Sequence, residues 1–132
     1  MKGLILDASM AMEWFAHDAS DEALEKRALL DDHAVLVPQL WQYEVTSVIT
    51  RWRRQGRITE ADATHALLEL GRLPLATIDQ VDLHAIVALA LAHDLSAYDA
   101  TYLHVAMISG EPLVTLDRQL QKAASAVGVT CL

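Results

Sequence analysis

Cysteine is nearly absent from this 132-residue chain: Cys131 is the single one, so no disulfide can form within the chain. Disulfides persist in oxidising compartments and are rare in the cytosol. The first residues, MKGLILDASM, contain one lysine and a short apolar run interrupted by Asp7, unlike a secretory signal. We therefore expect a cytoplasmic protein, with Cys131 as a small apolar residue in a last strand.

Long apolar runs are also missing. The longest nearly uninterrupted run covers residues 85–92, whereas a membrane-spanning helix needs about 20 residues, so we expect no membrane span. The hydrophobic content of 53% is enough for one core in a chain of this length. Because no repeat, low-complexity tract or linker interrupts the sequence, we expect a single domain over residues 1–132.

Positive charge is scarce: ten Lys and Arg stand against eighteen Asp and Glu, giving a formal charge of -8. This balance argues against a general electrostatic attraction to nucleic-acid phosphates, so any such contact must be local. Within seven positions lie Arg51, Arg53, Arg54 and Arg57. Their guanidinium groups can bind phosphates, or they can simply complement the dipole at a helix end, and both interpretations remain open.

The pattern of elements is typical of an α/β fold. Short leucine-rich or β-branched runs alternate with longer segments of helical period, as in a parallel sheet flanked by helices. Five short strands are predicted, at residues 4–7, 35–37, 75–78, 113–115 and 129–132. Helices are predicted at residues 8–15, 20–32, 39–55, 59–71, 79–93, 97–109 and 117–126.

Acidic residues fall where this fold would place a ligand site. Asp7 ends the first predicted strand and Asp117 follows the fourth, so both lie at the carboxyl edge of the sheet. Glu44 lies on the apolar side of its helix, where a carboxylate needs a partner. Asp99 lies in the first turn of a late helix, where the dipole favours negative charge.

Each acid also has a simpler explanation. Asp7 and Asp117 can cap the helices that follow them, and Asp99 has capping-box spacing with Ser96. Glu44 gains nothing from capping, so its simpler explanation is a buried ion pair, for instance with an arginine.

If these acids converge, their mutual repulsion needs compensation. Two carboxylates about 4 Å apart repel by roughly 4 kcal/mol at an effective dielectric constant of 20. A domain with a stability of about 5 to 15 kcal/mol cannot carry several such pairs uncompensated. The groups must then be protonated or share a cation. All-oxygen ligation suits Mg²⁺ or Mn²⁺, and the chain offers no cysteine or histidine cluster that would favour zinc.

Four segments, in this order, carry a family resemblance: LILDAS, PQLWQYEVTSVI, LSAYDATYLHVA and PLVTLDRQLQKAA. Their order, their spacing and the total length resemble the PIN-domain ribonucleases, most closely the VapC-like toxins of type II toxin-antitoxin pairs. The resemblance runs from end to end. It implies a PIN-like three-layer fold with a short parallel central sheet of about five strands.

The resemblance also implies an activity: endonucleolytic hydrolysis of RNA phosphodiester bonds by water that Mg²⁺, or Mn²⁺, activates. Ser9 and Thr115 are implied as supporting hydroxyls that could orient a ligand. A cognate antitoxin protein and a homodimer are implied as partners. The implied catalytic residues and metal ligands are Asp7, Glu44, Asp99 and Asp117.

Three further points stay open. A chain with this fold could be a catalytically inactive module that binds only RNA or protein, although the intact set of acids argues against it. For substrate binding the candidates are Arg118, beside Asp117, and Arg51 and Arg54. A cluster of large apolar residues can be either core or a groove for an antitoxin helix, shared with Trp41 or Trp52. This cluster comprises Met10, Met12, Trp14 and Phe15.

Overall fold

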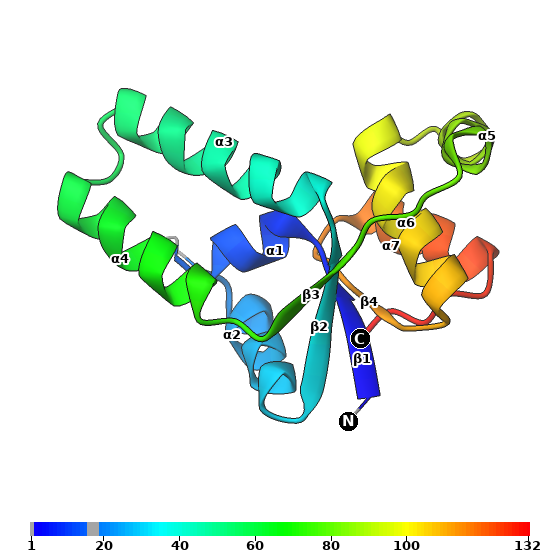
Figure 1. The fold of residues 1–132 in the computed structure, drawn as a ribbon, viewed down its shortest axis with the longest axis horizontal. Coiled ribbons are helices and arrows are strands. Elements are labelled where there is room, and N and C mark those ends of the chain that lie inside the picture. Colours follow the sequence, from blue (N-terminus) through cyan, green and yellow to red (C-terminus); the bar gives the residue numbers. More distant parts are fainter. Residues whose placement is uncertain (1, 16–18) are drawn as a thin grey trace.

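The computed structural model describes residues 2–15 and 19–132 and has an α/β fold of three layers (Figure 1). A parallel sheet in the order β3-β2-β1-β4 forms the middle layer. Its strands are β1 (Lys2–Leu6), β2 (His33–Pro38), β3 (Leu75–Ile78) and β4 (Leu113–Val114). This confirms the predicted α/β class and the parallel sheet.

Helices cover both faces of the sheet (Figure 1). On one side lie α1 (Ala8–Glu13), α2 (Asp21–Arg27), α3 (Leu40–Arg54) and α4 (Glu60–Gly71). On the other side lie α5 (Leu83–His93), α6 (Ala97–Ser109) and α7 (Arg118–Ala126). A 3-10 turn, Ala28–Asp31, follows α2, so the predicted helix at residues 20–32 is divided in two. Among the described residues no helix has the length and apolar character needed to cross a membrane.

The fifth predicted strand is wrong. Residues 129–132 make one isolated parallel bridge, between Cys131 and Leu113. In it the Leu113 N–H donates to the carbonyl of Thr130 at 2.8 Å, and the Leu132 N–H donates to the carbonyl of Leu113 at 3.0 Å. Because β4 itself has only two residues, it offers no ladder long enough for a further strand.

The start of α5 also differs from the prediction, which placed it at residue 79. The helix begins at Leu83, and Asp82 caps it: an oxygen of its carboxylate accepts a hydrogen bond from the Ala85 N–H at 3.2 Å. The Asp82 N–H donates to Nε2 of buried His104 on α6 at 3.0 Å. These two contacts fix the N-terminus of the helix at Leu83, so the residues before Asp82 lie outside it.

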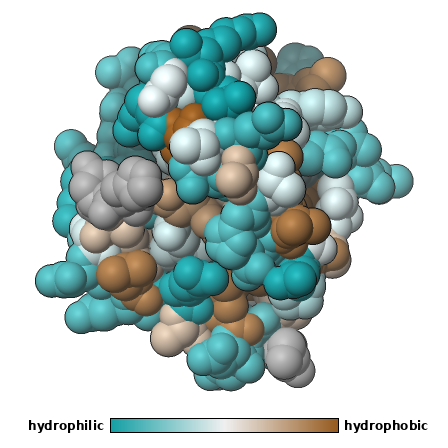
Figure 2. Space-filling model, turned by 90° about the vertical axis from the view of Figure 1, so that its left-hand side faces the viewer, coloured by the Kyte–Doolittle hydropathy of each residue, from teal (hydrophilic) through white to brown (hydrophobic). Residues whose placement is uncertain are grey.

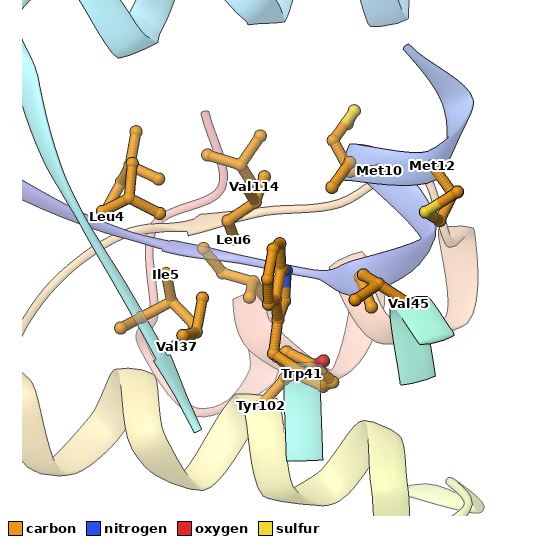
Figure 3. Packing of buried hydrophobic residues seen from close by; sticks show 14 of the residues in the cluster. Leu4, Ile5, Leu6, Met10, Met12, Val37, Trp41, Val45, Tyr102 and Val114 are labelled. Atoms are coloured by element: carbon orange, nitrogen blue, oxygen red, sulfur yellow. The ribbon is translucent and has the colours of Figure 1, made fainter. Parts of the chain in front are cut away.

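The core lies around β1 and the helices that pack on it (Figure 3). Met10, Met12 and Trp14 are buried in it, and the Trp14 indole donates to the carbonyl of Ala23 at 2.7 Å. These three side chains therefore serve as core, as one of the two interpretations predicted. Phe15 is only partly buried and lines a recess with Trp52, so a groove for an antitoxin at that position stays a prediction. Tyr102 is fully buried and rises from α6 toward α3.

Candidate active site

Asp7 occupies the point where β1 gives way to α1, and it is 4% exposed. Its carboxylate caps α1 by accepting from the Ser9 N–H at 3.2 Å, as the capping interpretation predicted. The other oxygen accepts from two hydroxyls, Ser9 Oγ at 2.8 Å and Thr115 Oγ1 at 2.7 Å. Three hydrogen bonds therefore fix the orientation of this carboxylate at the carboxyl edge of the sheet.

Thr115 connects two of the acids. Besides donating to Asp7, its hydroxyl oxygen accepts from the Asp117 N–H at 3.1 Å. Asp117 in turn caps α7, where its carboxylate accepts from the Leu120 N–H at 2.9 Å. Because β1 and β4 are parallel neighbours, the residues after their ends meet at the same edge.

Glu44 projects from α3 toward α6 and is half-buried. Its partner is the hydroxyl of Tyr102, which donates to Oε1 at 2.7 Å. No ion pair of Glu44 with an arginine occurs among the described residues, so the alternative of a buried ion pair is wrong. Burial, then the charges of Asp7 and Asp99, raise the pKa of Glu44 above its ordinary value, and the Tyr102 hydrogen bond opposes this.

Asp99 lies in the first turn of α6, where the Ser96 hydroxyl accepts from its N–H at 3.0 Å. Burial raises the pKa of Asp99, and the charges of Asp7 and Asp117 raise it further. Together with Glu44, this couples all four acids electrostatically, although they come from four different elements. The structure thus brings the predicted acids to one rim of the sheet.

The donor chemistry of this rim fits a hard divalent cation, because every candidate ligand is a carboxylate or hydroxyl oxygen. Within residues 2–15 and 19–132, however, no three Asp, Glu, His or Cys side chains converge closely enough to hold a metal ion. The acids share an electrostatic environment without forming a closed coordination shell. Their role as ligands therefore stays a prediction.

The three arginines predicted to bind substrate lie in two places. Arg118, next to Asp117, pairs with Glu22 at 3.3 Å and donates to Gln121 at 3.0 Å, so its charge is already partly used. Arg51 and Arg54 lie on the exposed side of α3. Both positions remain predictions for substrate binding.

Tyr102 is the site residue that the sequence interpretation missed. It lies one helical turn after Asp99, within a segment that reads as core. A buried tyrosine needs a hydrogen-bond partner, and that requirement was the available signal. The partner itself could not be named, because Glu44 is 58 positions away along the chain.

Comparison with known proteins identifies the family of this chain. A family model described as PIN domain matches residues 4–126. Ribonuclease VapC3 of Pyrobaculum aerophilum is 33% identical over 121 residues, which cover 89% of this chain and 91% of that protein. Ribonuclease VapC3 of Mycobacterium tuberculosis is 32% identical over 130 residues, covering 95% of this chain and 92% of that protein.

Solved structures share the fold. PAE2754 from Pyrobaculum aerophilum superimposes with a TM-score of 0.75 at 24% identity, over 98% of this chain and 83% of that one. FitAcB from Neisseria gonorrhoeae gives a TM-score of 0.69 at 12% identity, over 98% and 96% of the two chains. With its acids, its fold and these relatives, the chain belongs to the PIN-domain family, within the VapC ribonucleases.

Proposed function

We propose that this protein is a metal-dependent endoribonuclease and the toxin of a toxin-antitoxin pair. The observation that supports it best is that Thr115 joins Asp7 and Asp117 at the carboxyl edge of the sheet, with Glu44 and Asp99 near enough for the charges to raise their pKa values. Such a group of like charges is favourable when a divalent cation lies among them. One or two Mg²⁺ or Mn²⁺ ions would polarise the attacking water and neutralise charge on the phosphate.

The residues of the chain have separate tasks in this proposal. Asp7 is the fixed ligand, because hydrogen bonds from Ser9 and Thr115 hold its carboxylate in one orientation. The pKa values of Glu44 and Asp99 are raised, and a bound cation would favour their anionic forms. Asp117 completes the set from the start of α7. The carboxylates act as ligands, and no side chain forms a bond with RNA.

Partners follow from the same family. The protein acts in the cytoplasm, and a cognate antitoxin silences it. A homodimer is supported by α5, which leaves Leu83, Val87 and Leu91 in solvent at four-residue spacing, on one face of the helix. An antitoxin side chain finds a recess of about 80 Å³ between α3 and α4, lined in part by Phe15, Trp52 and Ile58.

RNA cleavage with substituted acids tests the activity. Wild type should cut a mixture of transfer and ribosomal RNA in Mg²⁺ or Mn²⁺ and lose this activity in EDTA. Asp7→Asn and Asp99→Asn should each lower the rate by at least about 100-fold, as expected when a group that stabilises transition-state charge is removed. Gel analysis of the fragments over time gives the rates.

Asp31→Asn is the matched control, because Asp31 is exposed and lies in the 3-10 turn after α2. Purified in parallel, it should cut like wild type, and any contaminating nuclease would appear equally in all preparations. Cleavage that survives EDTA and both active-site substitutions would contradict the proposal. RNA binding without cleavage would instead support an inactive binding module.

A further inference from the structure

The exposed side of α3 carries a polar groove of about 460 Å³. Its lining residues follow each other at spacings of three and four, so they form one stripe along the helix. They are Tyr43, Thr46, Ser47, Thr50, Arg51 and Arg54. The opposite side of the same helix is buried through Trp41, Val45, Ile49 and Trp52. The stripe is therefore a surface that the fold of this chain leaves uncovered.

The four arginines near the end of α3 divide into two pairs. Arg53 donates to the carbonyl of Ile58 at 3.1 Å, and Arg57 lies over the Trp52 ring at 5.0 Å. Arg51 and Arg54 line the groove, and neither guanidinium group has an ion pair or hydrogen bond with any residue that the structure describes. Arg53 and Arg57 therefore make contacts within the fold, whereas the guanidinium groups of Arg51 and Arg54 are available to bind a ligand.

The groove starts beside the acidic rim. Tyr43 adjoins Glu44, which is the one acid on α3, and Arg51 lies seven positions after Glu44 and so on nearly the same side. From Glu44 to Arg54 the helix advances by about 15 Å, since each residue adds about 1.5 Å. The surface near this end of α3 is largely hydrophilic (Figure 2). In a chain of charge -8, this stripe is a local positive region that leads away from the site.

Tyr43 adds a second kind of contact. Its ring is 63% exposed at the edge of the groove, where a packing role does not account for it. An exposed aromatic ring next to arginines is the combination by which proteins bind single-stranded nucleic acid: bases stack on the ring and phosphates contact the guanidinium groups. The hydroxyls of Thr46, Ser47 and Thr50 are short and leave room for a backbone.

We propose that the outer stripe of α3 binds single-stranded RNA, with a base stacked on Tyr43 and phosphates held by Arg51 and Arg54. The inference rests on the proposed ribonuclease function and adds the path of the substrate, which leaves the acidic rim along α3. A single strand is favoured over a duplex because the ring can stack only on an unpaired base.

Binding measured without metal separates this path from catalysis. Fluorescence anisotropy with a 5′-labelled oligouridylate of 20 nucleotides, in EDTA and at several salt concentrations, gives the dissociation constant of each variant. The double variant Arg51→Gln/Arg54→Gln should bind about tenfold or more weakly. The slope of log K against log salt should become less steep by about 0.7 for each phosphate that the variant no longer neutralises.

The matched control is Arg53→Gln/Arg57→Gln, which removes the same charge from the same end of α3. It should bind RNA within about twofold of wild type once circular dichroism confirms that it is folded at the assay temperature. Tyr43→Ala should weaken binding by about fivefold or more, whereas Tyr43→Phe keeps the ring and should bind like wild type.

Equal losses in the two arginine pairs would mean a general charge effect and would overturn the path, as would unchanged binding of the Arg51/Arg54 pair. A wild-type chain that does not bind this RNA overturns the path as well. The proposed function fails by a different result, the absence of metal-dependent cleavage. If the Arg51/Arg54 pair instead loses affinity for a protein partner while RNA binding is unchanged, the stripe is a protein interface and the proposal is wrong.

Discussion

Helices α3 and α5 are both surface helices, yet they leave opposite kinds of side chain in solvent. α3 buries a stripe of large apolar residues and exposes hydroxyls and arginines. α5 has no Asp, Glu, Lys or Arg between Leu83 and His93, and Ile86 is its one buried residue among those described. Leu83 is 73% exposed and Leu91 is 81% exposed.

The difference indicates two kinds of partner. A helix that is apolar on all sides is stable in water only when another surface covers it, so α5 is suited to a protein contact. The apolar side of α3 is already buried within the domain, and its outer side exposes arginine side chains and hydroxyl groups. In our proposals, therefore, the helix that carries Glu44 also carries the polar surface for RNA, and the contact between two copies is assigned to a helix that contributes no acid.

The largest expected effect comes from charging α5. Leu83→Glu/Leu91→Glu places two like charges on the face that we propose joins two copies, and burying them unpaired is costly. We expect the dimer to dissociate, with its dissociation constant raised by at least about 100-fold, while the monomer stays folded. Sedimentation equilibrium measures the dissociation constant, and circular dichroism checks the fold.

Leu67→Glu/Leu68→Glu is the matched control, since Leu67 and Leu68 are also exposed leucines but lie on α4. It adds the same charge and should leave the association unchanged. If this control dissociates as readily as the α5 variant, net charge and not the α5 face governs assembly. The proposal that α5 is the protein contact would then be wrong.

Much of the fold could be predicted because it depends on local patterns. The capping box of α4, with Thr59 and Asp62, was readable as residue spacing and is present. The α5 start could not be placed, because it depends on a tertiary contact between Asp82 and His104. The prediction of a last strand at residues 129–132 was wrong for a similar reason: strand pairing depends on the length of the neighbouring strand, here the two-residue β4.

The site divides in the same way. Asp7 and Asp117 follow directly from strand ends in a parallel sheet, so their meeting at one edge was predictable. Glu44 was singled out because a mid-helix acid on an apolar side needs a partner. The partner, Tyr102, was not predictable, since α3 and α6 are far apart in sequence and the pattern carries no information on which polar groups face each other.

Tyr102→Phe tests how Glu44 on α3 is held, and its effect should be smaller than that of charging α5. The hydroxyl holds Glu44 in one orientation and favours its anion. Without this hydroxyl, ordering and deprotonating the carboxylate costs part of the binding free energy of the metal. The Mn²⁺ binding free energy should weaken by about 1.5 kcal/mol, the low end for a hydrogen bond to a charged group, which is roughly tenfold in affinity. Calorimetric titration with Mn²⁺ measures it.

Tyr98→Phe removes the same atom from an exposed tyrosine on the same helix and should bind Mn²⁺ like wild type. In a Glu44→Gln background, Tyr102→Phe should cause no further loss of affinity, because the group that it holds is gone. A tenfold loss that persists in this background would show that Tyr102 acts through packing and not through Glu44.

The smallest expected effect is a dependence of stability on pH in the metal-free protein. Burial and neighbouring charges raise the pKa of Glu44 above 4.5 and that of Asp99 above 3.8, their ordinary values. The folded chain thus binds these protons more tightly than the unfolded chain. Their contribution to stability is complete below the ordinary values and is lost as pH rises through the raised ones.

Urea unfolding in EDTA from about pH 4 to about pH 7 measures this loss, which should be smaller in Glu44→Gln/Asp99→Asn. The control Glu25→Gln/Asp31→Asn removes two exposed acids and should keep the wild-type slope. Mg²⁺ at neutral pH should oppose the loss in wild type, because a cation that binds only the folded state stabilises it. Equal slopes in all three proteins would mean that burial and neighbouring charges do not perturb Glu44 and Asp99, which would contradict this prediction.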